Sequence, residues 1–275
     1  MNFKISRLSA GISSLVIGGT PVTLDNERVG TVRVLPGPPP GVDVQSYDEN
    51  DRFLRLTFGN LTLKSGEVVA VVLKSLGGKS VPSRSGKEDK IWRDVSHRNV
   101  LPLLGEVLFS SGPGQRSIKH LVSPVLCNGN FVHYLSQNPS EYSEKRLNDF
   151  IAQMLAGIVH LHGRNYSHGD FKLDNVLIND SREAVICDFG LSTEIVRGTN
   201  HLPTTPYVRS LGPKRYHSAE ILNLGVKMLN ATVLLAPHRP TTPPAFSESP
   251  PRKSPESDMW AFGMAILHLY LQETA

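Results

Sequence analysis

The segment YSHGDFKLDNVLI, from Tyr166 to Ile178, places the polar residues His168, Asp170, Lys172 and Asn175 directly before an apolar run. It cannot be ordinary helix, because it links a strongly periodic helical segment to a strand-like one. Its polar side chains therefore lie in a connection between two regular elements, where binding and catalytic residues are common. The chemistry and the fold of the chain are both predicted outward from this segment.

Two short apolar strands are predicted from the end of this segment onward. NVLI and AVICDF, which begin at Asn175 and Ala184, are separated by the turn-forming residues 179–182. A hairpin of these strands would bring Asn175 and Asp188 together at one end, with Asp170 beside them. Two hard oxygen ligands next to a carboxylate suit Mg²⁺ and a phosphate.

Each short motif has an ordinary structural explanation when it is taken alone. Gly and Asp are common in turns, so residues 168–170 (HGD) and 188–190 (DFG) each favour simple turn chemistry. Their joint occurrence with Lys172 and Asn175, after a helix and around a hairpin, favours phosphoryl chemistry instead. Lys172 then supplies positive charge for the transferring group.

Two long helices are predicted in the second half of the chain. The first runs from Ser143, its N-cap, to His162, and its apolar residues recur at helical spacing: Leu147, Phe150, Ile151, Met154, Leu155, Ile158 and Leu161. The second, DMWAFGMAILHLYL (258–271), is apolar on nearly all sides, which predicts a helix buried inside a larger domain. The chain stops at Ala275, soon after this segment.

The N-terminal half is predicted to be mostly β with one helix. The segments are a strand-like VGTVRVL (29–35), a linker PGPPPG (36–41), a hairpin of RFLRLTF (52–58) and GEVVAVVL (66–73), a short helix (88–95) and a strand IKHLVSPVL (118–126). The proline-rich residues 236–255 are expected to be a disordered insertion. The fold class that follows is α+β.

The sequence resembles the protein kinase superfamily, of the serine/threonine or tyrosine-kinase-like type. HGDFKLDN is similar to the family's catalytic loop, usually H-R-D-x-K-x-x-N, and CDFGLS is similar to its DFG segment. Further similar stretches are HRNVLPLLG (97–105), LVSPVLCNGN (121–130), GPKRYHSAE (212–220) and SDMWAFG (257–263). Together they cover about residues 52–275.

The resemblance implies a bilobal fold with a β-rich N-lobe and a mainly helical, incomplete C-lobe. The N-lobe and hinge would occupy residues 51–126, and the partial C-lobe residues 127–275, including the insertion at 236–255. Residues 1–50 would then form an N-terminal extension that contains the Pro/Gly linker.

The resemblance also implies roles for individual residues. Asp170 would accept or orient the proton of the substrate hydroxyl, and Lys172 would steady the γ-phosphate. A lysine at this position of the motif is the form found in serine/threonine kinases. Asn175 and Asp188 would hold Mg²⁺ on the phosphates of ATP. Asp258 would support the backbone of the catalytic loop.

The nucleotide-binding half of the resemblance rests on the N-terminal residues. Glu88 stands where the family keeps the glutamate of its N-lobe helix. Ser123 would be the gatekeeper, and Val125 and Leu126 would belong to the hinge that faces the adenine. Glu220 matches the glutamate of the family's A-P-E motif.

The sequence departs from the family pattern in three places, of which the first two predict weakened nucleotide binding and the third predicts activity that depends less on phosphorylation. Val72 stands at the lysine position of V-A-I-K, since the stretch reads VAVV at residues 69–72. Lys74 points to the same face, about 7 Å further along the strand, and either substitutes for that lysine or is a solvated lysine at a strand end, the commoner situation. No glycine lies between Val42 and Phe58, where the phosphate-binding loop should be. Gly169 replaces the arginine that would respond to a phosphorylated activation segment.

Three functions are consistent with these residues. The first is a protein serine/threonine kinase that uses ATP and Mg²⁺, and the second is a pseudokinase that binds or scaffolds signalling partners with weak or no catalysis. The third is a small-molecule phosphotransferase of the aminoglycoside or choline kinase type, whose members also have H-G-D followed by Asn. Lys172 and the complete DFG favour a protein kinase over the third.

Composition limits the partners and the compartment. A net charge of +4, spread along the chain, is weak evidence for a nucleic-acid partner, so ATP and a protein substrate or signalling partner are expected instead. No run approaches the roughly 20 apolar residues of a membrane span. The two cysteines, Cys127 and Cys187, have no metal-binding spacing and fit a reducing compartment, so we expect a cytoplasmic protein.

Overall fold

The computed structural model describes residues 20–25, 27–35, 56–76, 85–109, 117–195 and 253–272. They belong to two compact units, the first made of residues 1–160 and 173–190 and the second of residues 161–172 and 191–275. Several predictions fall on residues that are not described: most of the loop before Phe58, Glu220 of the A-P-E motif, and nearly all of the insertion at 236–255.

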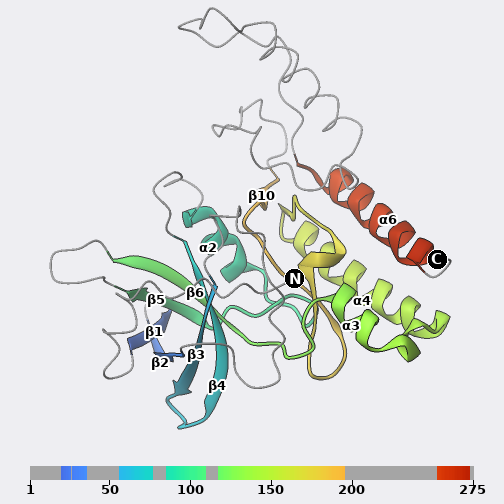
Figure 1. The fold of residues 1–275 in the computed structure, drawn as a ribbon. Helices are drawn as coiled ribbons and strands as arrows, with labels where there is room; N and C mark the ends of the chain where they lie inside the picture. Colours follow the sequence, from blue (N-terminus) through green and yellow to red (C-terminus); the bar gives the residue numbers. More distant parts are fainter. Residues whose placement is uncertain are drawn as a thin grey trace, which may run out of the picture. The chain divides into compact units, whose positions relative to one another are not determined.

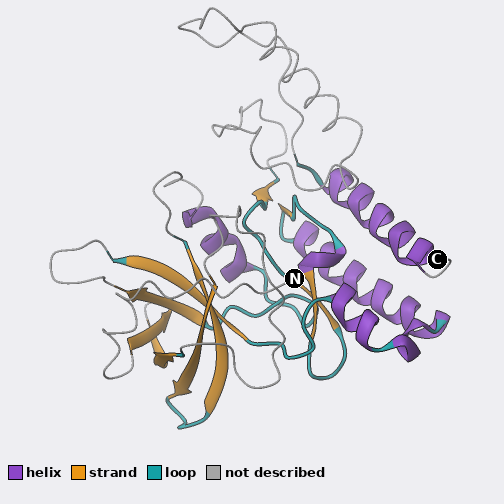
Figure 2. Ribbon diagram, viewed as in Figure 1, coloured by secondary structure: helices purple, strands orange, loops and turns teal. Residues whose placement is uncertain are grey.

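Six antiparallel strands of the first unit close into a barrel (Figures 1 and 2). They are β1 (Thr20–Leu24), β2 (Glu27–Val34), β3 (Leu56–Leu63), β4 (Val68–Ser75), β5 (Gly105–Phe109) and β6 (Ile118–Pro124), in the spatial order β1-β2-β3-β4-β6-β5. Because side chains alternate along a strand, each strand sends apolar residues inward. The barrel core is formed by Val22, Val32, Leu61, Val71, Leu73, Val107 and Val122.

The hairpin expected from residues 52–73 is confirmed as β3 and β4, which pair from Leu56↔Lys74 to Thr62↔Val68. Its turn contains Gly66 at φ 87°, a conformation that glycine adopts without strain. The barrel begins earlier in the chain than residue 51, where the sequence analysis placed the start of the N-lobe. The reason is that β2 pairs with β3, and β1 pairs with both β2 and β5, so the predicted extension supplies two barrel strands.

His120 on β6 is a buried histidine whose ionisation should affect stability. Its ring packs edge-on against Phe109, with centroids 5.1 Å apart, and is 5% exposed. Burial lowers the pKa of His120, although a hydrogen bond to the carbonyl of Ile118 opposes this. Since the folded pKa lies below the unfolded value of about 6.5, stability is complete above that pH and falls as the pH decreases towards the folded pKa.

We therefore expect His120→Phe to flatten the pH dependence of unfolding. The measurement is the urea midpoint at a series of pH values from 5 to 8, for the wild type and the variant. The wild type should lose stability on the acid side, and the variant should lose less. Equal slopes for the two proteins would show that His120 does not titrate on folding.

The first unit also contains the helices that pack around a short hairpin. α2 (Ser85–Asp94) lies beside the barrel (Figure 1), and α3 (Phe131–Gln137) and α4 (Glu144–Gly163) confirm the helical content expected after the hinge. A 3-10 turn, η1 (Pro139–Tyr142), joins α3 to α4. Asn130 caps α3 by accepting the N–H of His133 at 2.8 Å.

The predicted hairpin is confirmed as β8 (Val176–Ile178) and β9 (Ala184–Ile186), preceded by the 3-10 turn η2 (Leu173–Asn175). Both backbone hydrogen-bonding groups of Ile186 are used: its N–H donates to the carbonyl of Asn99, and its carbonyl accepts the N–H of Leu101. Gly157 of α4 lets the helix approach this strand closely, since a Cβ there would lie 2.6 Å from Ile186. The hairpin is therefore held rigidly at the end that carries the candidate site.

The second unit contains β7 (Tyr166–Ser167), β10 (Thr193–Glu194) and α6 (Pro255–Gln272). β7 and β10 pair antiparallel, and α6 packs its buried side, which includes Phe262 and Leu269, within this unit. The helix predicted over residues 258–271 is confirmed, but it is not buried all round: Trp260 is 50% and Leu271 58% exposed. Apolar composition predicted the helix correctly and could not tell which of its faces is covered.

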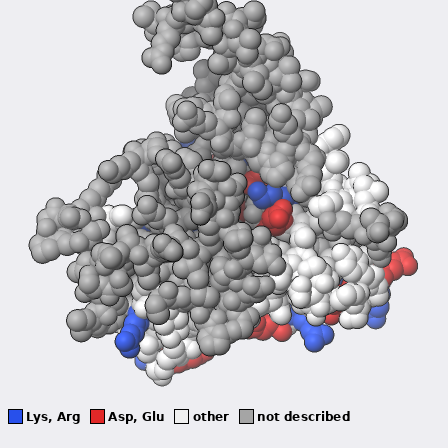
Figure 3. Space-filling model, in the orientation of Figure 1, with Lys and Arg blue, Asp and Glu red and all other residues white. Residues whose placement is uncertain are grey.

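Charged side chains of opposite sign lie next to one another on the face drawn in Figure 3. Within the first unit, Arg98 pairs with Glu183, and Arg146 pairs with Glu141 while its guanidinium lies over the ring of Phe150.

None of the helices that the structure describes has the length and apolar character needed to cross a membrane.

Candidate active site

Lys74 is held between two carboxylates in the first unit. Its Nζ lies 2.6 Å from Oε1 of Glu88 on α2 and 2.7 Å from Oδ1 of Asp188, which follows β9. The three side chains are only 12%, 9% and 18% exposed. Charges paired at this distance and shielded from water interact much more strongly than a surface pair. The triad therefore joins the barrel, α2 and the β8–β9 hairpin through one ammonium group.

The charge of Lys74 is stabilised by its partners. Burial alone would lower the pKa of Lys74, but the negative charges of Asp188 and Glu88, together with their hydrogen bonds, raise it well above its ordinary value. A pKa that is raised in the folded state stabilises the fold at every pH below the unfolded value of 10.5, and this contribution is lost only at more alkaline pH. Lys74 is therefore a permanent cation in the physiological range.

A cleft opens beside Lys74, with apolar walls and a charged end. The walls include Leu56, Val72, Leu101 and Leu177, and the charged end holds Lys74 and Asp188. The space between these residues is about 450 Å³ when the open solvent at its mouth is included. Such a cleft suits a ligand with a flat apolar ring and an anionic group.

Ser123 lines the cleft from β6, where it pairs in register with Val72. The two predicted hinge residues that follow differ in whether their backbone N–H groups are hydrogen-bonded. The N–H of Val125 donates to the carbonyl of Ala70 at 2.9 Å, whereas no described residue accepts the N–H of Leu126. Of the two predicted hinge residues, only Leu126 thus has a backbone N–H without an acceptor among the described residues, and neither residue is among those that line the cleft.

Asn175 and Asp188 lie at the same end of the β8–β9 hairpin. The N–H of Cys187 donates to the carbonyl of Asn175 at 2.9 Å, and Asn175 is 3% exposed. Asp188 has φ 67°, a left-handed conformation that Asp tolerates better than most residues. The prediction that the hairpin joins these two residues is confirmed by its register.

Several residues of the site were not found from the sequence, among them the cleft walls Leu56, Leu101 and Leu177, Trp92 and Cys187. Trp92 donates its indole N–H to the carbonyl of Leu101 at 2.6 Å and packs against Phe189 with ring centroids 5.8 Å apart. Cys187 carries a buried thiol that forms no disulfide. Trp92 could have been found, because it lies four residues after Glu88 and thus on the same side of the predicted helix.

The second unit holds the loop that carries Asp170 and Lys172. The carboxylate of Asp258, on α6, accepts the backbone N–H groups of His168 and Gly169 at 2.7 and 2.8 Å and contacts Nε2 of His162 at 2.9 Å. Asp258 is 1% exposed. A buried carboxylate with several donors is strongly bound and fixes the loop backbone.

Asp170 and Lys172 contact each other, with Lys172 Nζ 3.2 Å from Asp170 Oδ2. Gly169, between His168 and Asp170, has φ 76°, and a Cβ there would lie 2.4 Å from the carbonyl oxygen of Leu191. The backbone at this position therefore excludes an arginine side chain. The glycine that departs from the family pattern is required by the path of this chain.

Comparison with known proteins identifies the family of this chain. The model of the family described as the protein kinase domain matches residues 61–275, which is most of the chain. The chain belongs to the protein kinase domain family. Its β1–β2 hairpin and the first part of β3 lie before the matched residues.

Kinases of more than one specificity are similar to this chain. It is 27% identical over 165 residues to the serine/threonine-protein kinase PLK4 of Drosophila grimshawi, covering 58% of this chain and 20% of the relative. It is 33% identical over 135 residues to the tyrosine-protein kinase JAK1 of Danio rerio, covering 48% and 11%. It is 25% identical over 180 residues to the tyrosine-protein kinase Fer of Rattus norvegicus, covering 66% and 18%. The chain thus spans a fifth or less of these relatives' lengths.

The ion pair of Lys74 bears on the alignment of the kinase lysine motif. In protein kinases the lysine of V-A-I-K pairs with the glutamate of the following helix, and here Lys74 makes an ion pair with Glu88 of α2. This contact favours aligning V-A-I-K with Val71-Val72-Leu73-Lys74, two residues later than residues 69–72. Val72 lines the cleft, and the apolar repeats of the strand do not reveal this register.

Proposed function

We propose that this protein kinase domain transfers the γ-phosphoryl group of ATP to serine or threonine hydroxyls of a protein substrate. The observation that carries the proposal is the buried triad of Lys74, Glu88 and Asp188 at the charged end of the cleft. Protein kinases require the corresponding lysine–glutamate ion pair for activity.

Within the proposal, the first unit binds the nucleotide. The apolar walls hold the adenine, the N–H of Leu126 donates to the ring, and Ser123 leaves room at the inner wall. Lys74 binds the phosphates with a charge that Glu88 orients. These residues lower the barrier by positioning and by stabilising negative charge, which is where phosphoryl transfer gains most.

The residues present fit a magnesium ion. No three His, Cys, Asp or Glu side chains come together to hold a metal within the described ranges, so the donors would be the amide of Asn175 and the carboxylate of Asp188. Such a sparse set of hard oxygens suits Mg²⁺, which takes its remaining ligands from phosphate and water. When bound, the ion neutralises charge on the phosphates.

The second unit supplies the groups for the acceptor. Asp170 accepts the proton of the substrate hydroxyl, and Lys172, held 3.2 Å from it, keeps a positive charge for the transferring group. Lys172 supports serine and threonine as acceptors. Since relatives of both specificities are similar to the chain, phosphoamino-acid analysis of the product decides between these and tyrosine.

Asp170→Asn tests the proposal directly. We expect its transfer rate to a mixed peptide library to fall at least ~100-fold, with Mg·ATP binding unchanged in a thermal-shift assay. Asp149→Asn, on the exposed side of α4, is the matched control and should retain full activity. Binding of ATP without any transfer that depends on Asp170 would instead identify a pseudokinase.

The chemical class of the phosphate acceptor distinguishes a protein kinase from the third alternative. Transfer to an amino sugar or choline, with none to peptides, would identify a small-molecule phosphotransferase.

We also propose a cytoplasmic location, which is supported by the thiols of Cys127 and Cys187, neither of which forms a disulfide.

A further inference from the structure

Neighbouring residues of α2 face two different groups of charges. Glu88 pairs with Lys74, whereas Asp89 accepts from Arg93 at 2.7 Å and from Lys119 at 2.9 Å. Successive residues of an α-helix are rotated by about 100° around its axis. Contacts on two faces that differ by this angle leave α2 little freedom to rotate.

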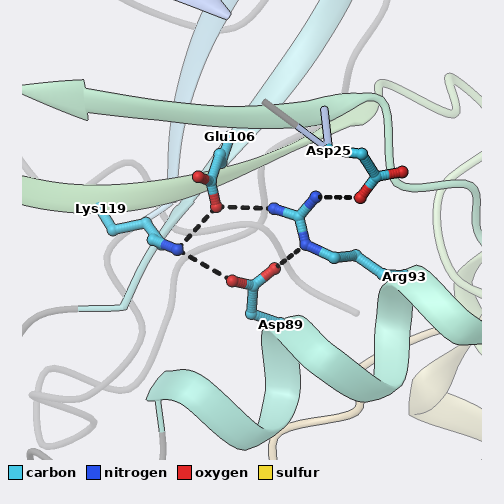
Figure 4. A network of polar contacts seen from close by, with 5 residues as sticks. All are labelled: Asp25, Asp89, Arg93, Glu106 and Lys119. Atoms are coloured by element: carbon cyan, nitrogen blue, oxygen red, sulfur yellow. Dashed lines mark hydrogen bonds and ion pairs between the residues drawn. The ribbon is translucent and has the colours of Figure 1, made fainter. Parts of the chain in front are cut away.

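The second group is a network of five charged side chains (Figure 4). Arg93 donates to Asp89, to Glu106 of β5 at 2.7 Å and to Asp25 at 3.1 Å. Lys119 of β6 also contacts Glu106, at 2.7 Å. Arg93 is thus the one cation that contacts all three carboxylates of the network, while Lys119 contacts two.

The barrel carries the partners of α2 in this network. Asp25 follows β1 directly, and β1 pairs with β5 at Thr23↔Glu106, so closure of the barrel brings Asp25 and Glu106 to the same part of the unit. Asp25 precedes the residues that the kinase family model matches. This contact therefore comes from a residue outside the matched segment.

We propose that Asp25, Asp89, Arg93, Glu106 and Lys119 form a clamp that fixes the rotation of α2 and so positions Glu88 against Lys74. Arg93 is the principal positioning residue. Without it, Asp89 and Glu106 would share Lys119 alone, and their mutual repulsion would push α2 away from β5. A rotation of α2 would carry Glu88 out of reach of Lys74. The effect on nucleotide binding rests on the proposed function, whereas the effect on Lys74 does not.

The test measures the exposure of Lys74 without any nucleotide. Wild type and Arg93→Gln are treated with an amine-acylating reagent, and the rate of modification at Lys74 is followed by mass spectrometry. We expect the rate to rise about tenfold in Arg93→Gln, a factor equivalent to about 1.4 kcal/mol. Arg93→Lys, which retains a cation, should recover part of the protection.

Two controls separate positioning from general loss of structure. Arg98→Gln removes an arginine from an exposed ion pair with Glu183 and should leave the Lys74 rate at the wild-type value. The modification rate of Lys64, on the β3–β4 turn, should be the same in all variants. If Arg93→Gln does not fold, Asp25→Asn serves instead, because Asn tolerates the φ of 51° at this position.

The outcomes are distinct. A lower melting temperature with an unchanged Lys74 rate would overturn the clamp and leave Arg93 a purely structural role. A faster Lys74 rate together with a lower kcat/KM for peptide phosphorylation supports both the clamp and the proposed function. A faster Lys74 rate in a protein that never binds ATP supports the clamp and rejects the proposed function alone.

Discussion

Lys74→Met is expected to lower the rate of phosphoryl transfer at least ~100-fold, because it removes a preorganised charge from the site of the transferring group. Methionine preserves much of the side-chain volume, so the barrel should still form. The carboxylates of Glu88 and Asp188 would face each other without the ammonium that now lies 2.6 and 2.7 Å from them. Breaking a buried ion pair costs about 3–5 kcal/mol, so the melting temperature should fall as well.

The measurements are peptide phosphorylation, Mg·ATP affinity and thermal unfolding of the same preparations. Lys64→Met is the matched control, since Lys64 lies exposed on the turn after β3, and it should behave as the wild type. Wild-type activity in Lys74→Met would mean that another cation binds the phosphates, and the alignment of the kinase motif with Lys74 would lose its functional meaning.

Asp258→Ala is expected to destabilise the second unit by about 3–5 kcal/mol and to abolish measurable transfer. Its carboxylate accepts two backbone N–H groups, from His168 and Gly169, and is almost completely buried. With alanine both donors would lose a charged acceptor, each such hydrogen bond being worth about 1.5–3 kcal/mol. The loop that carries Asp170 would then no longer hold one backbone conformation.

Asp258→Asn should be intermediate, because the amide keeps one acceptor oxygen and turns an NH₂ group towards the other donor. Glu256→Ala is the control. It removes another acidic residue from the first turn of α6, and with it the favourable interaction with the helix dipole, but leaves the two backbone contacts in place. Equal losses in Glu256→Ala and Asp258→Ala would assign the effect to the helix terminus and not to the loop. The comparison uses urea unfolding and the peptide assay.

Much of the fold followed from the pattern of apolar and turn-forming residues. The helix from 143 to 162 shows a clear 3.6-residue period, and the hairpins of β3–β4 and β8–β9 were predicted from apolar runs on either side of turn-forming residues. The DFG and catalytic-loop segments were found because their polar residues interrupt those patterns. Glu88 followed from its spacing to the motif at His97.

The register of the kinase lysine could not be predicted in the same way. Val69, Val71 and Val72 are interchangeable as apolar strand residues, and only the contact between Lys74 and Glu88 shows which residue faces α2. The two N-terminal strands were separated from the barrel for a related reason. Strand pairing across residues 36–55 is a long-range property, and the proline-rich linker indicated a boundary where the chain in fact returns to the same sheet.

The pairing of β1 with β5 has a further consequence for how this unit meets other molecules. A sheet with open sides offers unpaired backbone groups on which a foreign strand can assemble, and closure into a barrel removes them. Each of the six described barrel strands has a neighbour on both sides, although β1 and β5 meet at the single pair Thr23↔Glu106. A peptide that extends this sheet would therefore have to enter at the seam between β1 and β5, and partners of the other four described strands recognise side chains and not the main chain.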